Sequence, residues 1–449
     1  MNLLDPLFGW EAVDQVFSDS MRLQRMLDFE GALAKAEARL EIIPKSAAMP
    51  IASHCRAELL DTESLARAGA EAGNLAIPMV KQLTNLVAKS DKQAARYVHW
   101  GATSQDAVDT GLVLQLKDAI AVVENDLDRL SSALTQIVSA HRATPMAART
   151  WMQHAVPTTF GLKAAGWLDA LTRHRRRVQG LRDRALVLQF GGAAGTLASL
   201  GKRGMEVANV LGEELRLAVP AISWHAHRDR LAEVATTFAL LTGTLGKMAR
   251  DISLQAQTEV AEAFEPMAAG RGGSSTMPHK RNPVNCAVIL AAAERVPALT
   301  GTMLAGMPQE HERGLGGWHA EWETLPQLLR LAAGALHCMI NTIEGLQIDP
   351  ERMLRNLEGS QGLIFAEAIA MALADRIGKS EAHRIVEDAS KKATRERKHL
   401  REILSAEEAV TSLIPATELA KIFEPMNYIG VADQFIDRVI AASETLERR

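Results

Sequence analysis

The chain has 449 residues, of which 47% are hydrophobic, so it can bury a large core and is not a disordered polypeptide. Its 50 basic and 54 acidic residues leave a formal charge of −4, which excludes a protein whose main role is to neutralise nucleic-acid phosphates. Aromatic residues make up only 4%, which disfavours a β-sandwich or a β-barrel.

Helical patterns begin near the N-terminus. Residues 19–40 follow the candidate caps Ser18, Asp19 and Ser20 and are predicted to form a helix. Three later segments alternate apolar steps of three and four residues, the pattern of long helices that pack nearly parallel. These segments run over 116–137, 231–248 and 325–346.

Two more helices are predicted over 361–378 and 380–403, and no convincing run of alternating strand residues is found. The expected fold class is therefore all-α, with a central bundle of long helices and three helical domains. These domains would comprise residues 1–110, 111–350 and 351–449. Extended bundle seams also favour self-association, so we expect a homo-oligomer.

The cysteines and the N-terminal segment exclude further classes of protein. The three cysteines are widely spaced and form no Cys-x-x-Cys pair, so neither a disulfide framework nor a metal site is expected. The N-terminal segment carries acidic residues early and does not resemble a signal peptide. No run of about 18 uncharged apolar residues is present, so no membrane span is expected. We expect a cytoplasmic protein.

The segment with the most chemical information is the glycine- and serine-rich stretch 270–283, which reads GRGGSSTMPHKRNP. Its glycines and serines offer many free backbone N–H groups. Asn282 followed by Pro283 is a helix-start pattern, with Asn as N-cap and Pro at the first helical position. The N-terminus of the next helix, beside Lys280, is then expected to form a site for an anion.

This stretch resembles the signature loop of the fumarase/aspartase superfamily. Two other segments match the family's other two regions in the expected order: HWGATSQD at 99–106 and RTWMQHAVPTTFG at 149–161. The closing segment EPMNYIGVADQFIDRV is also similar, so the resemblance covers essentially the whole chain. It implies an all-α homotetramer without cofactor, whose active sites are each assembled from three subunits and bind a small polycarboxylate.

The resemblance also implies roles for individual residues. Ser274 would be the catalytic acid or base, and a serine can act so only where N–H donors and a nearby cation stabilise its alkoxide. The substrate would be bound by residues of all three regions and by one arginine further along the chain. The predicted substrate-binding residues are His99, Thr103, Ser104, Arg149, Thr150, Trp151, Gln153, His154, Ser275, Lys280, Asn282 and Arg313.

One position departs from the family's pattern, because Trp151 stands where most members carry a histidine that protonates the leaving group. An indole N–H cannot transfer a proton at neutral pH, and losing an acid costs ~10²–10⁴-fold in rate. A carboxylate leaving group needs no acid. Within the family that the sequence resembles, the reaction that fits is therefore a cycloisomerisation, which interconverts 3-carboxy-cis,cis-muconate and its lactone; the resemblance implies a role in aromatic degradation. The competing interpretation of this position is that His154 supplies the proton.

A second reaction of the same superfamily, an adenylosuccinate-lyase-like cleavage of a C–N bond, also fits the loop. Segment 311–322 disfavours it, because Gly, Leu and Trp stand where those enzymes place nucleotide-binding groups. Arg228 and Asp229 precede the second long stripe and are either site residues or part of a solvated turn. The basic cluster at 173–177 is predicted to be solvated helix surface.

Overall fold

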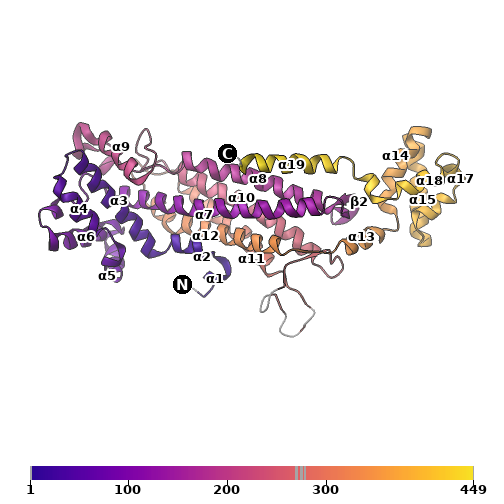
Figure 1. Cartoon of the computed structure of the whole chain (residues 1–449), viewed down its shortest axis with the longest axis horizontal. Coiled ribbons are helices and arrows are strands. Elements are labelled where there is room, and N and C mark those ends of the chain that lie inside the picture. The colour runs from indigo at the N-terminus through magenta and orange to yellow at the C-terminus, as the bar shows by residue number, and fades with distance from the viewer. Residues whose placement is uncertain (1–2, 268–271, 274–276, 278–279, 448–449) are drawn as a thin grey trace. The chain divides into compact units, whose positions relative to one another are not determined.

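The computed structural model describes residues 3–267, 272–273, 277 and 280–447, and it is built mainly of helices, as expected (Figure 1). The first α-helices are α1 (Asp5–Phe8), α2 (Glu11–Val16), α3 (Asp19–Arg39), α4 (Lys45–His54), α5 (Thr62–Ala72), α6 (Ala76–Ser90), α7 (Ser104–Ala140), α8 (Phe160–Arg184), α9 (Gly204–Leu215) and α10 (Asp229–Gln255). The later ones are α11 (Val284–Ala305), α12 (Gly317–Glu344), α13 (Pro350–Glu358), α14 (Ala366–Ile377), α15 (Lys379–Glu396), α16 (Leu400–Ser405), α17 (Glu408–Thr411), α18 (Ala416–Ile422) and α19 (Ala432–Glu447).

Shorter elements connect these helices. The 3-10 turns are η1 (Ala57–Leu59), η2 (Ala94–Tyr97), η3 (Gly192–Ala194), η4 (Ala198–Arg203), η5 (Leu363–Phe365) and η6 (Pro425–Tyr428). The strands are β1 (Pro145–Thr150), β2 (Gln153–Thr159), β3 (Ala263–Phe264) and β4 (Gln347–Ile348). β1 pairs antiparallel with β2, and β3 pairs antiparallel with β4.

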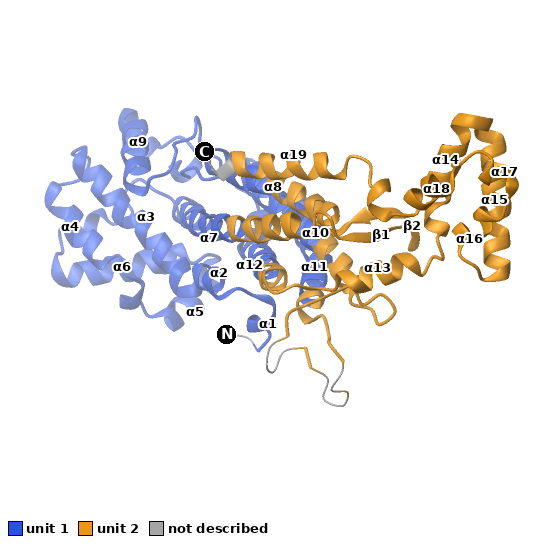
Figure 2. Cartoon of the chain, turned by 45° about the vertical axis from the view of Figure 1, so that its right-hand side comes forward, with its two compact units in different colours: residues 1–127, 174–245, 288–337 blue, residues 128–173, 246–287, 338–449 orange. Residues whose placement is uncertain are grey.

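The chain forms two compact units, and each is assembled from three separate stretches of sequence (Figure 2). Unit 1 comprises residues 1–127, 174–245 and 288–337. Unit 2 comprises residues 128–173, 246–287 and 338–449. The helices α7, α8, α10, α11 and α12 each contribute residues to both units. The division into three domains stays a prediction.

Unit 1 combines a cluster of shorter helices with parts of the long ones. α3 packs against α4 and α9, which lie beside it in Figure 1. The predicted cap is confirmed, because the Ser18 hydroxyl accepts a hydrogen bond from the Met21 N–H at 3.3 Å. The predicted apolar stripes are buried, as Leu116 on α7, Leu231 on α10 and Leu325 on α12 show.

The surface prediction for residues 173–177 is wrong in part: Arg173 and Arg176 are exposed as expected, but two of their neighbours are not. The basic cluster at 173–177 is not a solvated face throughout, because His174 and Arg175 are only 4% and 3% exposed. The His174 ring nitrogen Nε2 lies 2.8 Å from the Thr244 hydroxyl of α10. The positions point inward because α8 packs along this neighbouring helix.

Unit 2 has its own core at the C-terminal end of the chain. α14 and α15 pack together, with α16 and α18 against them. Side chains spaced three or four residues apart on these helices fill the core, which includes Ile369, Leu373, Val386, Leu400 and Leu404. α13 packs against β1, so the β1–β2 hairpin is held in the same unit.

The β1–β2 hairpin is not predicted by the sequence. Its two-residue turn, Trp151–Met152, has φ angles of 51° and 66°, the left-handed pair typical of a type I′ turn. Asn-Gly is the usual signal for this turn, and neither residue is present here. Pro157 also lies inside β2, where proline normally argues against a strand, whereas Pro145 opens β1, a position that proline can occupy.

α11 differs from the expectation that no helix can cross a membrane. By length and composition alone it is apolar enough to do so, yet only 33% of its most apolar 18-residue window is buried. Taken together, α13 and the segment Leu363–Ile377 are also long and apolar enough to cross a membrane, but the chain bends by 80° between them. Glu294 and Arg295 lie near the middle of α11, and charges at that depth are costly in a bilayer.

Candidate active site

The first predicted region forms a loop before α7, in unit 1. His99 and Gly101 both have left-handed backbones, with φ angles of 59° and 73°. A Cβ atom on Gly101 would lie 2.7 Å from the Leu200 side chain, so only glycine fits this turn. The His99 ring is fixed as well, because its Nδ1 lies 2.6 Å from Oε1 of the buried Glu30 on α3.

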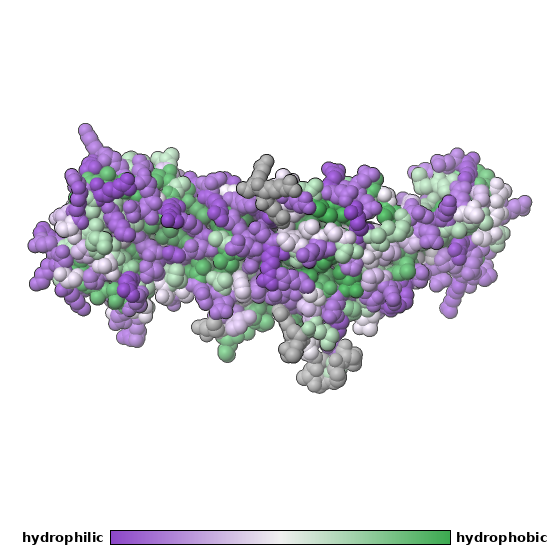
Figure 3. Space-filling view, viewed as in Figure 1, coloured by the Kyte–Doolittle hydropathy of each residue, from purple (hydrophilic) through white to green (hydrophobic). Residues whose placement is uncertain are grey.

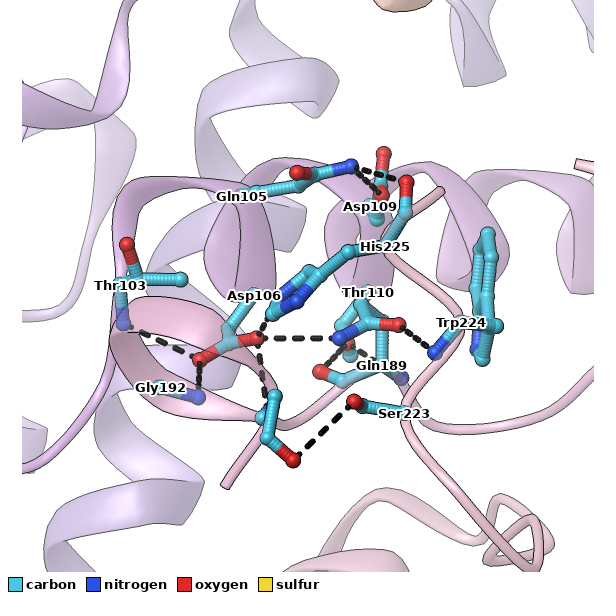
Figure 4. A network of polar contacts seen from close by, with 12 residues as sticks. Thr103, Gln105, Asp106, Asp109, Thr110, Gln189, Gly192, Ser223, Trp224 and His225 are labelled. Atoms are coloured by element: carbon cyan, nitrogen blue, oxygen red, sulfur yellow. Dashed lines mark hydrogen bonds and ion pairs between the residues drawn. The ribbon is translucent and has the colours of Figure 1, made fainter. Parts of the chain in front are cut away.

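Asp106, in the first turn of α7, holds this loop against a glycine-rich segment (Figure 4). It is fully buried, and its two oxygens accept five hydrogen bonds. The donors are the backbone N–H groups of Thr103, Gly191 and Gly192, the Gln189 amide, and Nε2 of His225, at 2.8–3.1 Å. One carboxylate thereby positions Thr103 and, directly after it, Ser104, where α7 begins.

Arg313 joins the same group of residues. Its guanidinium donates to Oε1 of Gln105 at 3.0 Å, to the Thr103 hydroxyl at 3.3 Å and to the Ala193 carbonyl at 3.1 Å. The structure therefore brings Arg313 and Thr103 together, although they are 210 residues apart in sequence. Two of these hydrogen bonds orient the first region, and the third connects Arg313 to the segment that contains Gly191 and Gly192.

Arg228 is an anchor behind this loop. It is 2% exposed and donates to Asp109 at 2.7 Å and to Glu321 at 2.5 Å. Trp318 also donates to Asp109, at 2.9 Å. Burial lowers the pKa of Arg228, but the two carboxylates outweigh it and raise that pKa above its usual value. Arg228 is therefore a buried cation that ties α7 to α12, not part of a solvated turn.

The second predicted region is the hairpin of unit 2. The Arg149 guanidinium makes two hydrogen bonds to Glu262, with Nη2–Oε1 and Nη1–Oε2 distances of 2.6 and 2.9 Å. The Glu262 side chain is fully buried and also accepts from the Asn356 amide at 2.8 Å. Arg149 is therefore held at the base of the hairpin tip, opposite His154 in the strand register.

Four predicted substrate-binding residues lie together at the hairpin tip. Thr150, Trp151, Gln153 and His154 are all exposed, and Trp151 is 95% exposed. Partial desolvation and the charge of Arg149 lower the pKa of His154 below its usual value. The tip thus presents one indole and one imidazole whose neutral form is favoured.

The third predicted region is described only in part. Ser274 and Ser275 lie outside the described residues. Lys280 is exposed, and Asn282 donates its backbone N–H to the Gly272 carbonyl at 2.9 Å. Both line a concavity of unit 2 together with Phe264 and Glu265 of the adjoining segment.

The expected anion site at the N-terminus of the next helix is wrong in one respect. α11 begins at Val284, and the Glu265 carboxylate accepts its first-turn N–H groups, from Asn285 at 3.0 Å and Cys286 at 2.7 Å. The protein's own carboxylate therefore occupies the position predicted for a substrate anion, and it replaces Asn282 as the cap. The roles of Asn282 and Lys280 in binding substrate stay predictions.

Comparisons with known proteins agree with this arrangement. Residues 10–298 match a family model described as lyase, and residues 362–439 match the adenylosuccinate lyase C-terminus. The chain is 54% identical to the 3-carboxy-cis,cis-muconate cycloisomerase of Pseudomonas aeruginosa, over 99% of this chain and 97% of the relative. It is 52% identical to the enzyme of the same name from Bradyrhizobium diazoefficiens, over 99% and 98%. The crystal structure of 3-carboxy-cis,cis-muconate lactonizing enzyme from Pseudomonas putida matches with a TM-score of 0.95 and 50% identity, over 99% of both chains.

Proposed function

This chain belongs to the lyase family of fumarase and aspartase, and from that membership we propose that it interconverts 3-carboxy-cis,cis-muconate and carboxymuconolactone. The observation that carries the proposal is the identity of 54% and 52%, over nearly the whole chain, to two enzymes named for this cycloisomerisation. The reaction belongs to the degradation of protocatechuate and related aromatic compounds, and we place the enzyme in the cytoplasm.

In the lactonising direction, a substrate carboxylate oxygen forms a C–O bond to one carbon of the neighbouring alkene. The alkene's electron pair moves toward the other carbon and its carboxylate, which gives an aci-carboxylate. The Ser274 hydroxyl then donates its proton to that carbon, so a C–H bond forms and the carboxylate is restored. Lys280 and Asn282 would hold the extra charge of the aci-carboxylate more tightly than that of the substrate.

Trp151 supports this reaction over others of the family. The hairpin places a donor-only indole at its exposed tip, next to a histidine whose pKa is lowered. Neither group is a ready proton donor at neutral pH. In the reverse direction the leaving group is a carboxylate, which is stable at pH 7 and needs no proton.

The test is the loss of ultraviolet absorbance of the conjugated diene when the purified protein meets carboxymuconate. Ser274→Ala serves as the matched inactive control. The match of residues 362–439 to the adenylosuccinate lyase C-terminus makes release of AMP and fumarate from adenylosuccinate the rival assay. Turnover of adenylosuccinate without turnover of carboxymuconate would reverse the assignment.

We further infer a homotetramer with shared active sites. The candidate side chains at the hairpin tip are exposed in the single chain, whereas an active site must exclude water. Leu240 of α10 and Leu304 of α11 are 55% and 46% exposed, and hydrophobic surface shows between hydrophilic areas in Figure 3. Light scattering gives the subunit number.

Mixing experiments test whether sites are shared. His99→Asn and Ser274→Ala lie in different predicted regions, so a mixed oligomer of two inactive variants would regain some intact sites. Two inactive variants of the same region would not. Equal inactivity of both mixtures would contradict shared sites.

A further inference from the structure

His99 is fixed both at its backbone and at its ring. Its φ of 59° lies in the left-handed region, and a non-glycine residue stays there only where its surroundings impose it. The ring nitrogen Nδ1 lies 2.6 Å from Oε1 of Glu30, whose side chain is fully buried in the middle of α3. Because a carboxylate oxygen only accepts, Nδ1 carries the hydrogen. Nε2 is then the ring atom that can meet a ligand.

The protonation state of His99 decides what Nε2 offers. Across the residues that the structure describes, Nε2 has no hydrogen-bond partner, and 17% of the side chain is exposed. In the neutral ring Nε2 carries a lone pair, which repels a carboxylate. In the protonated ring the same atom donates a hydrogen bond. Only the protonated form suits a polycarboxylate substrate.

The charged groups around His99 come from two helices. Burial lowers the pKa of His99, but the charge and hydrogen bond of Glu30 on α3 and the charge of Asp106 on α7 outweigh it. The pKa of His99 therefore lies above its usual value. A third acid, Glu37, lies two turns beyond Glu30 on α3, and its two side-chain oxygens are buried without a partner.

Glu37 does not add a second negative charge beside Glu30. Burial and the charge of Glu30 raise the pKa of Glu37 to about 9, so its carboxyl group is neutral at pH 7. Glu30 therefore acts on His99 without a second negative charge beside it. The two glutamates of one helix differ in role because only Glu30 contacts an imidazole.

We propose that Glu30 is a positioning residue that holds His99 by Nδ1 in its protonated form, so that Nε2–H donates to a carboxylate of the substrate. The inference rests on the proposed function, because it assigns to His99 one carboxylate of carboxymuconate. Glu30 does not touch the substrate and acts only through the imidazole.

The first measurement needs no substrate. Hydrogen–deuterium exchange at the histidine Cε1 position, followed by peptide mass spectrometry across pH, reports the titration of His99 alone. We expect the wild-type residue to titrate above pH 6.5, its usual value. Glu30→Gln should titrate lower by about 1–3 pH units. Glu37→Gln, the same exchange on the same helix, should leave the titration unchanged.

The second measurement is the pH profile of the reaction. Glu30→Gln should raise KM for carboxymuconate about tenfold at pH 8, and less toward pH 6, where His99 gains a proton without help. Glu37→Gln should leave KM unchanged. A rise in KM that is equal at all pH values would indicate a structural role and overturn the proposal.

The two measurements separate the possible failures. If His99 titrates at or below pH 6.5 in the wild type, or does not respond to Glu30→Gln, the role of Glu30 is refuted whatever the substrate. If the wild type does not turn over carboxymuconate, the proposed function fails, while the exchange measurement still decides the link between Glu30 and His99.

Discussion

Trp151→His tests the assigned reaction most directly. Trp151 is 95% exposed, so the substitution should change the free energy of unfolding by no more than about 0.5 kcal/mol. Histidine also tolerates the left-handed backbone at this position better than most residues, so the turn should keep its shape. With the stability and the turn unchanged, kcat for lactonisation should fall or stay level, because a carboxylate leaving group gains nothing from an acid.

The size of the opposite effect makes the result decisive. If a missing acid limited the reaction, restoring it would raise kcat by ~10²–10⁴-fold. Initial rates of diene loss, measured beside thermal unfolding of the same preparation, resolve the two cases. Met152→His is the matched control, since this neighbour is 76% exposed and also left-handed. A clear gain for Trp151→His, absent in the control, would refute the carboxylate-leaving-group argument.

Three further substitutions have defined outcomes. Ser274→Ala should lower kcat by at least ~10²-fold with an unchanged melting temperature, and near-normal turnover would remove this serine from the mechanism. Glu262→Gln should lower the free energy of unfolding by about 2–3 kcal/mol, because the Arg149 guanidinium loses its buried partner; an unmoved urea midpoint would contradict this. Glu37→Gln should flatten the pH dependence of stability between pH 4.5 and 9, where the unfolded wild type releases a proton that the folded chain keeps. The stability removed in the wild type is about 1.4 kcal/mol per pH unit over that window, and equal slopes for both proteins would disprove it.

Local signals in the sequence predicted the long helices well, but the helix expected over 380–403 is wrong in extent, because α15 ends at Glu396 before the left-handed Arg397 and α16 begins at Leu400. The stripes of α7, α10 and α12 and the Ser18 cap depend on residues within a few positions of one another, and the structure confirms them. The hairpin escaped prediction because its turn has Trp151 and Met152 where a type I′ turn favours Asn-Gly.

The contacts that could not be predicted from the sequence connect residues that are far apart along the chain. Glu265 caps α11 from 20 residues away, so the local pattern assigned the cap to Asn282 instead. Arg228 meets Asp109 and Glu321 at separations of 119 and 93 residues, and no local pattern reveals such pairing. The family's motifs still identified the loop regions, because their spacing is specific even where the contacts are unknown.

The three stretches of each unit alternate along the chain, so neither unit can be completed early in synthesis. Unit 1 begins with the N-terminal helices, such as α3, but it is complete only when residue 337 has been made. Unit 2 is complete only when the segment 338–449 has been made. At about 5–20 residues per second, a ribosome needs roughly 10–40 s to make the residues between 127 and 337. During that interval the apolar side chains of α7 have not yet met those of α12. The apolar side chains of the nascent chain therefore stay exposed throughout this interval, and a chaperone that binds apolar helices during synthesis would cover them.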